Sequence, residues 1–355
     1  MTRVMIAAGG TAGHVVPALA VADALRARGA DIEWIGGERA EAELVPAAGY
    51  ELHTLRVAGL DRRNPLRAAR AAALAVGAVG AARRLLRARG ADAVLGGGGY
   101  VSGPVGLAAA TLRLPLFLTE ADSHVGVANR MLAPLARRLF LAFPVAGREG
   151  DTYPVTGRPV PAGTGSVDRA EARRRLGLPV DGPCLLVFGG SLGARRLNEA
   201  AVEAFGVRAP CVVLHASGRR DYEDLRARLG AETDHYRLVP YVQPFADALA
   251  AADLVAARSG GSVWEVVAAG VPSILVPYPH ATADHQAKNA RFMAAAGAAV
   301  VVPDAELDGP RLASEVEAIL GDPIRLEGMS VAAREVARPD AADRIAHEVL
   351  ALTGA

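Results

Sequence analysis

His14 is the residue in this sequence whose type and position most clearly raise a question of chemistry. It ends the glycine-rich loop GGTAGH (residues 9–14), which follows the apolar run 4–8 and opens a helical pattern that Gly29 closes. Glycine lets the backbone approach a ligand, and free N–H groups at a helix start favour anions. An imidazole there tends to stay neutral, so it can accept a proton from a hydroxyl. The alternatives are a histidine that caps the helix or one that only binds phosphate.

Two further glycine-rich loops, residues 96–104 and 189–194, also follow apolar runs and open helical patterns. One such loop can serve packing alone, whereas three favour phosphate binding. A dinucleotide site needs G-x-G-x-x-G and an acidic residue about 20 positions further on. The first loop breaks that spacing, although Glu33 lies at the right distance, near the predicted end of the second strand. The loop at 189–194 has no such acid after its next strand, so the dinucleotide fingerprint is incomplete in both halves.

A second group of polar residues lies between 258 and 290. Glu265 falls early in a predicted helix, where a carboxylate can hold two ribose hydroxyls or can simply favour the helix start. Gln286 and Asn289 are three residues apart and share one helical face, which suits recognition of a sugar. The spacing of His280, Asp284 and His285 is not a standard zinc pattern, so we predict no metal site.

The alternation of apolar runs and helical patterns occurs twice along the 355 residues. A hydrophobic content of 51% and a charged content of 22% indicate a folded chain, and the length suits two domains. We therefore predict an α/β protein with two facing doubly wound parallel-sheet domains and a cleft between them. A segment rich in Pro, Gly and Thr (152–165) reads as the linker. The predicted divisions are 1–157, 158–335 and a C-terminal helix in 336–355 that packs back on the N-terminal domain.

The net charge of +1 gives no strong field for nucleic acid, and the two cysteines show no repeated spacing typical of a disulfide framework. The sequence starts with a strand rather than a signal peptide, and no apolar segment reaches the roughly 20 residues of a spanning helix. Residues 61–90 place eight arginines and one acid around an apolar centre at 71–82. This pattern predicts a helix at an anionic membrane surface or, alternatively, a crossover helix with arginines on its solvent face. The arginines are Arg62, Arg63, Arg67, Arg70, Arg83, Arg84, Arg87 and Arg89.

The motifs GGTAGHVVPALA, GGYVSGP, TEADSHVGVANR, GGSLGA, RSGGSVWE and PYPHATADHQAKNA occur in this order between about residues 3 and 303. Together they resemble the MurG family, the UDP-N-acetylglucosamine-dependent N-acetylglucosaminyltransferases that make lipid II from lipid I in peptidoglycan synthesis. The resemblance implies the two-domain GT-B architecture, an inverting hexosyl transfer and no metal or other cofactor. It also implies UDP-GlcNAc and lipid I as substrates and a peripheral place on the cytoplasmic face of the cell membrane.

The resemblance assigns roles to residues by position. The catalytic residues are His14 and Glu120, and the acceptor-pyrophosphate residues are Gly10, Gly98, Gly99 and Tyr100. The donor-binding residues are Thr11, Ala12, Gly13, Asp122, Arg158, Ser191, Gly193, Ala246, Ser262, Glu265, His285, Gln286 and Asn289. The N-terminal domain would then hold the acceptor and face the membrane, and the C-terminal domain would hold the donor.

Three positions depart from the family's pattern. The chain has Asp122 where Asn is common, Leu192 where Gln is common, and Pro161 where a phosphate-binding Arg is common. Arg158 can supply that cation from three residues earlier. Two alternative functions remain: a non-hydrolysing UDP-GlcNAc 2-epimerase, and a nucleotide-sugar-binding regulatory protein without turnover. Incubation with UDP-GlcNAc alone separates the first alternative, because an epimerase needs no acceptor.

Overall fold

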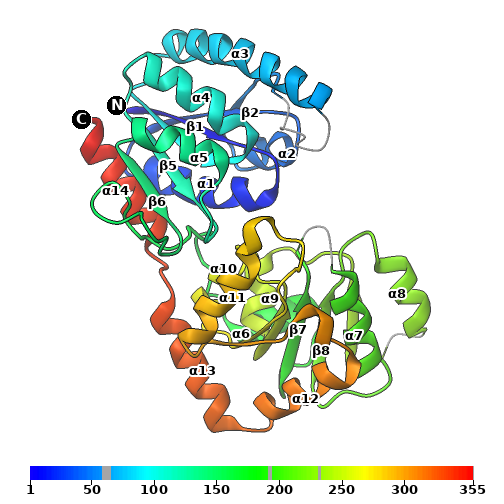
Figure 1. Cartoon of the computed structure of the whole chain (residues 1–355). Helices are drawn as coiled ribbons and strands as arrows, with labels where there is room; N and C mark the ends of the chain where they lie inside the picture. The colour runs from blue at the N-terminus through cyan, green and yellow to red at the C-terminus, as the bar shows by residue number, and fades with distance from the viewer. Residues whose placement is uncertain (58–64, 191–193, 231–232, 355) are drawn as a thin grey trace. The chain divides into compact units, whose positions relative to one another are not determined.

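The computed structural model describes residues 1–57, 65–190, 194–230 and 233–354; between 65 and 75 it describes one side chain, that of Leu74. The chain divides into two compact units (Figure 1). Unit 1 comprises Met1–Pro161 and Arg338–Ala355, and unit 2 comprises Ala162–Ala337. The first division therefore falls four residues after the one expected at 157, and Arg158 belongs to unit 1.

Unit 1 is an α/β sandwich around a six-stranded parallel sheet with the order β3-β2-β1-β4-β5-β6. Its strands are β1 (Arg3–Ala8), β2 (Asp31–Gly36), β3 (Glu51–Thr54), β4 (Ala93–Gly98), β5 (Leu116–Glu120) and β6 (Arg138–Leu141). Its helices are α1 (Ala12–Ala27), α2 (Ala40–Ala47), α3 (Pro65–Ala88), α4 (Gly99–Thr111), α5 (Val127–Leu132), η1 (Ala133–Leu135) and α14 (Ala341–Thr353).

Successive residues of β1 face opposite layers of unit 1. Val4 and Ile6 lie in one core with residues of α1 and α14, and Met5 and Ala7 lie in the other with residues of α3 and α4. A parallel strand buried on both faces needs apolar residues at every position, which explains the continuous apolar run at 4–8. The C-terminal helix α14, red in Figure 1, packs on α1 although more than 300 residues separate them in sequence.

Unit 2 repeats this architecture with the order β12-β11-β10-β7-β8-β9, which is the order of unit 1 listed from the other edge. Its strands are β7 (Cys184–Phe188), β8 (Val212–Ala216), β9 (Tyr236–Val239), β10 (Leu254–Ala257), β11 (Ser273–Leu275) and β12 (Ala299–Val301). Its helices are α6 (Arg169–Leu176), α7 (Arg195–Phe205), α8 (Tyr222–Leu229), α9 (Phe245–Ala251), α10 (Val263–Ala268), η2 (Thr282–Asp284), α11 (His285–Ala295), η3 (Asp304–Glu306), α12 (Gly309–Leu320) and α13 (Pro323–Val336). The predicted α/β class with two parallel sheets is confirmed.

Two local predictions need correction. Glu33 is the third residue of β2 rather than near its end. Its buried carboxylate accepts hydrogen bonds from Nε and Nη2 of Arg89 at 2.7 and 2.8 Å. The segment read as a linker begins as part of unit 1, because Leu141 at the end of β6 bonds the backbone of residues 154–156. The last of these contacts is the hydrogen bond from Thr156 N–H to the Leu141 carbonyl, five residues before the unit boundary at Pro161.

Helix α3 has a buried face and an exposed face. Ala78, Ala82 and Leu86, spaced four apart, are buried in the core of unit 1, whereas Arg84 and Arg87 are exposed. The helix therefore serves as a crossover helix and also presents basic side chains to solvent. Arg62 and Arg63 lie outside the described residues, and Arg89 is occupied by its carboxylate partners. In the part of the chain that the structure describes, no helix is long and apolar enough to cross a membrane.

Candidate functional site

The glycine-rich loops at residues 9–14 (loop one) and 96–104 (loop two) of unit 1 meet at His14. His14 is the last residue of loop one and lies in the first turn of α1, and Gly98 ends β4. A Cβ on Gly98 would lie 2.5 Å from Cδ2 of the His14 ring, and Gly98 has a φ of +94°. Glycine at 98 is therefore required both by the backbone and by the ring that packs on it. The structure thus brings two of the predicted site residues into contact.

The surroundings of His14 favour its neutral form. Burial lowers the pKa of His14 below its ordinary value of 6.5; the carboxylates of Asp122 and Glu41 raise it, and the Arg158 guanidinium lowers it. Its Nδ1 lies 3.3 Å from the Thr11 hydroxyl. If Nδ1 carries the proton and donates a hydrogen bond to the Thr11 hydroxyl oxygen, Nε2 keeps its lone pair. Nε2 has no hydrogen-bond partner among the described residues. Such a ring can accept a proton.

Arg158 is buried beside loop one. Its Nη2 donates to the carbonyl oxygen of Gly13 at 2.9 Å, and its charge acts on His14. The sequence placed this arginine with the donor phosphates in the second domain, but the structure places it in unit 1. Its contribution here is to fix the backbone of loop one and to disfavour protonation of His14.

Glu120 ends β5 and is oriented by two donors. The backbone N–H of Gly126 and the side-chain amide of Asn129 donate to its Oε2 at 2.8 and 2.9 Å. Burial raises the pKa of Glu120, these hydrogen bonds lower it, and the charge of Asp122 raises it. Asp122 therefore influences both predicted catalytic groups. A buried carboxyl group whose pKa is raised can take part in proton transfer.

The predicted acceptor-pyrophosphate residues have most of their donors engaged inside unit 1. Gly10 N–H donates to Glu41 at 2.7 Å, the Tyr100 hydroxyl donates to Glu41 at 2.7 Å, and Gly98 N–H donates to the Ser102 hydroxyl at 2.9 Å. Gly99 sits against loop one, since a Cβ there would lie 1.8 Å from the carbonyl oxygen of Gly9. The buried carboxylate of Glu41 thus joins the two loops, and the sequence analysis did not predict this role for it.

In unit 2, the loop after β10 is tied to α11 by polar contacts. The Ser259 hydroxyl donates to the Gln286 carbonyl at 2.8 Å, and the Asn289 side chain donates to the Ser259 carbonyl at 3.1 Å. Gln286 Oε1 accepts from the backbone N–H of Tyr278 at 2.9 Å. Gln286 and Asn289 share α11 as predicted. Asn289 is fully buried and Gln286 is not, so Asn289 holds the loop while Gln286 remains accessible to a ligand.

Four of the remaining predicted donor residues follow the ends of strands in unit 2. Ser262 precedes α10, and Glu265 lies in its first turn and is partly exposed. His285 begins α11 with Nδ1 2.9 Å from the Thr282 carbonyl, and Ala246 lies in the first turn of α9. Ser191 and Gly193 lie outside the described residues. Thr11 and Ala12 belong to loop one of unit 1, beside Gly13.

A chain of buried hydrogen bonds in unit 2 was also not predicted from the sequence. Tyr236, His215 and Asn198 are linked at 2.8 and 3.0 Å, and Asn198 donates to Asp221 at 3.0 Å. Burial lowers the pKa of His215 to about 3. The segment CVVLH (211–215), which runs into β8, has the composition of any apolar strand. Only the fold shows that both ring nitrogens of His215 are hydrogen-bonded.

One group of described residues has the spacing of metal ligands: Glu33, Glu51 and His53 offer ligand atoms within 4.8 Å of one another. Arg89 already bonds Glu33 and pairs with Glu51 at 3.0 Å. A guanidinium between the two carboxylates supplies the charge that a cation would supply, so this group is an ion-pair cluster.

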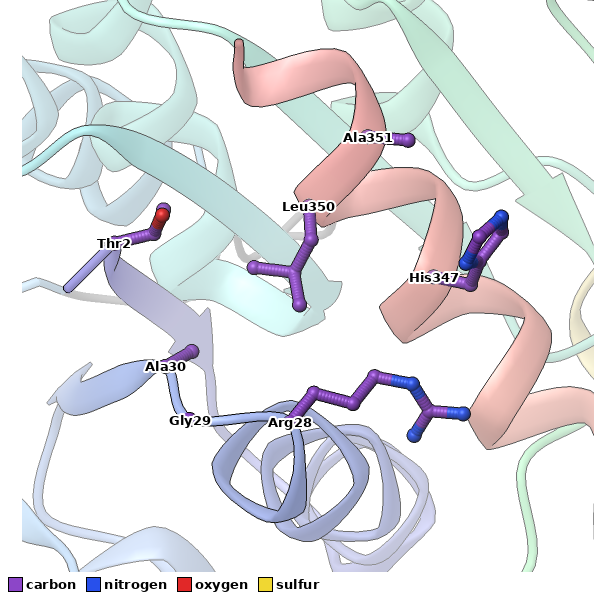
Figure 2. Close-up of a pocket in the computed structure, with 7 residues that line it drawn as sticks. All are labelled: Thr2, Arg28, Gly29, Ala30, His347, Leu350 and Ala351. Carbon is purple, nitrogen blue, oxygen red and sulfur yellow. The ribbon is translucent and has the colours of Figure 1, made fainter. Parts of the chain in front are cut away.

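A pocket of 320 Å³ in unit 1 lies away from these loops (Figure 2). It is lined by Thr2, Gly29 and Ala30, which precede β1 and β2, and by Leu350 and other residues of α14. Figure 2 shows the Arg28 side chain extending toward α14, where it pairs with Asp343 at 2.6 Å. Ligands of doubly wound sheets bind at the carboxyl ends of strands, so the pocket's place at the amino ends excludes it as the candidate site.

Both halves of the chain match one glycosyltransferase family. Residues 4–141 match the glycosyltransferase family 28 N-terminal domain, and residues 184–345 match its C-terminal domain. The chain is 43% identical over 354 residues to a protein of Nitrosococcus oceani, with 98% of each chain covered. That protein is named UDP-N-acetylglucosamine–N-acetylmuramyl-(pentapeptide) pyrophosphoryl-undecaprenol N-acetylglucosamine transferase.

Solved structures separate likeness of fold from likeness of sequence. The crystal structure of Acinetobacter baumannii MurG is 30% identical with a TM-score of 0.78, covering 99% of this chain and 100% of that one. A UDP-GlcNAc 2-epimerase from Neisseria meningitidis, bound to UDP-GlcNAc, has a TM-score of 0.69 at 13% identity, covering 99% and 100%. The epimerase shares the fold alone, whereas the transferases share the sequence as well.

Proposed function

The chain belongs to the family of UDP-N-acetylglucosamine–N-acetylmuramyl-(pentapeptide) pyrophosphoryl-undecaprenol N-acetylglucosamine transferases, and from this membership we propose its reaction and the residues that carry it out. The protein transfers N-acetylglucosamine from UDP-GlcNAc to the muramoyl C4 hydroxyl of lipid I, which yields lipid II. The observation that carries this function is the near-full-length identity to enzymes of that name. The fold by itself does not, because an epimerase shares it.

The reaction needs a proton acceptor for the attacking hydroxyl. The hydroxyl oxygen forms a bond to the anomeric carbon, the bond from that carbon to the UDP oxygen breaks, and the configuration inverts. The hydroxyl proton passes to Nε2 of His14. This assignment is supported by the neutral state of His14 and by the free lone pair of its ring. Glu120, with its raised pKa, is the alternative acceptor.

The donor is held by residues of unit 2. Glu265 accepts hydrogen bonds from the ribose hydroxyls, and Gln286 contacts the N-acetylglucosamine. Support comes from the partly exposed positions of both side chains and from the Ser259 and Asn289 contacts that hold their loops. The pyrophosphate of UDP binds at the loop that contains Ser191 and Gly193, where a helix start favours anions. No protein metal ligand is assigned to this step.

A direct test is transfer of labelled N-acetylglucosamine from UDP-GlcNAc to a short-chain lipid I analogue. Wild-type protein should form the disaccharide product and UDP in equal amounts. A control reaction contains UDP-GlcNAc but no acceptor. Formation of UDP-ManNAc in that control would identify an epimerase, and binding of donor without either product would identify a regulatory protein.

The acceptor is lipid-linked, so the protein must reach a membrane surface, and we propose that the exposed side of α3, α4 and α5 does so. Helix α4 packs on α3 and also on α5. Val76 and Met131 are 76% and 74% exposed. Among the described side chains, the large exposed apolar ones on these helices and η1 are Val76, Leu107, Met131 and Leu135. The exposed arginines include Arg84, Arg87 and Arg130, together with Arg137 just after η1. Apolar side chains surrounded by arginines suit the headgroup region of an anionic leaflet, which for this acceptor is the cytoplasmic one.

Replacing Arg83, Arg84 and Arg87 by Gln should weaken binding to anionic vesicles by about 1 kcal/mol per charge that lies near the surface. Turnover of a soluble acceptor analogue should not change. The matched control replaces Arg219, Arg226 and Arg228 of unit 2, which removes the same charge elsewhere. Vesicle sedimentation measures both. Equal binding by the two variants would leave α3 as a crossover helix only.

A further inference from the structure

Glu41 is a buried carboxylate that joins three loops of unit 1. It accepts hydrogen bonds from Gly10 N–H at 2.7 Å, Gly37 N–H at 2.9 Å and the Tyr100 hydroxyl at 2.7 Å. Its side chain is fully buried. Burial raises its pKa and these hydrogen bonds lower it, with a net lowering, so Glu41 is ionised at neutral pH. A single carboxylate therefore fixes the loops after β1, β2 and β4 relative to one another.

The glycines around Glu41 leave the space that it and Tyr100 occupy. A Cβ on Gly9 would lie 2.5 Å from Oε1 of Glu41, and a Cβ on Gly37 would lie 1.9 Å from the Tyr100 hydroxyl. A Cβ on Gly36 would lie 2.8 Å from Cγ of Glu41. These distances are too short for any real side chain. The glycines at 9, 36 and 37, in the loops after β1 and β2, therefore leave room for the Glu41 and Tyr100 side chains in these positions.

Tyr100 in turn supports an exposed cation. The guanidinium of Arg39 lies over the Tyr100 ring, 4.9 Å from its centroid. Arg39 is exposed, and no carboxylate among the described residues forms an ion pair with it. A guanidinium that stacks on an aromatic face keeps its in-plane N–H donors available for an anion. Tyr100 thus positions the guanidinium of Arg39, whose N–H groups form no ion pair with the described carboxylates.

A diphosphate at these glycine loops would need such a cation. The N–H groups of Gly10 and Gly98 already donate to Glu41 and Ser102, so the backbone offers fewer donors than the glycine motifs promise. The carboxylate of Glu41 adds a negative charge behind loop one. Arg158, the other arginine at loop one, donates to the Gly13 carbonyl. Arginine binds phosphate oxygens through paired N–H donors, and such charge-assisted bonds are strong.

We propose that Arg39 binds the diphosphate of the lipid-linked acceptor, with Tyr100 and Glu41 acting as positioning residues for its guanidinium. The inference rests on the proposed function for the identity of the acceptor. It assigns Tyr100 a different part from that of a phosphate ligand, because its hydroxyl serves Glu41 and its ring serves Arg39. The occupant is a diphosphate ester, whether it arrives on a soluble analogue or in a bilayer.

The test measures steady-state kinetics with a water-soluble, short-chain lipid I analogue and no bilayer. Arg39→Gln should raise the acceptor KM by about tenfold or more, as expected for loss of a hydrogen bond between charged groups. The donor KM and kcat should change less than about twofold, since the contact is the same in ground and transition states. Arg39→Lys, which keeps the charge but loses the paired donors, should be intermediate. Tyr100→Phe keeps the ring and should cost less than Arg39→Gln in the same parameter.

Arg26→Gln is the matched control. Arg26 is also an arginine of unit 1 stacked on a tyrosine, 4.3 Å from the centroid of Tyr50, but it lies in the last turn of α1. Its acceptor KM should equal that of the wild type. An acceptor KM of Arg39→Gln equal to that of Arg26→Gln would overturn the inference. So would a loss of vesicle binding by Arg39→Gln with an unchanged KM for the soluble analogue, because that result assigns Arg39 to lipid headgroups.

The failure of the proposed function is visible separately. If wild-type protein does not glycosylate the analogue, both the function and this inference are wrong. If the wild type is active and the acceptor KM of Arg39→Gln matches that of the control, only the inference is wrong. Thermal melting of each variant checks its fold, and the exposed position of Arg39 predicts unchanged melting.

Discussion

His14 in unit 1 and His215 in unit 2 both have a lowered pKa, yet they differ in how many ring nitrogens their surroundings engage. Burial is the first cause of the shift in both. His215 is completely buried, and its two ring nitrogens bond Tyr236 and Asn198 at 2.8 and 3.0 Å. His14 is only partly buried, and the hydrogen bonds of the described residues use only its Nδ1. A lowered pKa therefore marks a reactive histidine only when a lone pair remains open to a substrate.

The comparison extends to the two sheet ends. The loops of unit 1 carry ionised groups that act on one another: Glu41, Asp122 and Arg158 all influence His14. In unit 2, the neutral side chains of Ser259 and Asn289 bond the loop after β10 to α11, and the one charged contact of that loop's first residue is the structural ion pair of Arg258 with Asp304. A proton acceptor needs a tuned electrostatic environment, whereas a site that orients hydroxyls needs rigid polar groups. Two units with one strand order thus suit different parts of a transfer reaction.

The largest effect should follow from His14→Ala. General-base catalysis typically contributes about 10²–10⁴-fold, so kcat should fall by about that factor with little change in donor KM. The base is active when neutral, so wild-type activity falls as pH drops through the pKa of His14, below its ordinary value. That acidic limb should vanish in the variant. His14→Gln should not restore kcat, because an amide cannot take the proton. A normal kcat with a raised acceptor KM would instead make His14 a phosphate ligand and Glu120 the base.

Glu265→Ala tests the binding part assigned to unit 2. Loss of hydrogen bonds from the ribose hydroxyls to a charged group costs about 1.5–3 kcal/mol, so the donor KM should rise by roughly tenfold or more. The acceptor KM should stay constant. Glu317→Ala, an exposed glutamate of α12 in the same unit, is the control. A donor KM equal to that of the control removes Glu265 from the site.

The strands and glycine loops of both units could be predicted from the sequence, because apolar runs buried on both faces and glycine turns leave local signals. Glu41 could not, since Glu38, Glu41 and Glu43 lie within six residues and spacing does not say which one turns inward. The placement of Arg158 and the pairing of Arg89 with Glu33 depend on tertiary contacts over 56 or more residues. Charge counts along the chain therefore overstate how many arginines remain open to a ligand or a membrane.

His215 provides a smaller, structural test of the same contrast. Its pKa falls from 6.5 to about 3 in the folded protein, so below pH 6.5 the unfolded chain binds a proton that the folded chain does not. Stability is fully present above that pH and is lost as pH falls from 6.5 toward 3. Between pH 7 and 5.5 the free energy of unfolding should drop by about 1 kcal/mol from this group. Urea unfolding of wild type and His215→Gln measures it. An equal drop in both proteins would show that other groups cause the loss.

The smallest effect should come from Asp122→Asn, and its sign is the sharpest check on His14. The carboxylate of Asp122 favours the imidazolium and so raises the pKa of His14. Removing that charge should lower the pKa of His14 and move the acidic limb of the pH–rate profile to lower pH. Members of the family commonly have Asn at this position, so the variant should fold normally. Glu43→Gln, an exposed acid on α2 that is not among the groups shifting His14, should leave the limb in place. An unmoved limb in Asp122→Asn would mean that the group titrating in the profile lies outside this cluster of charges.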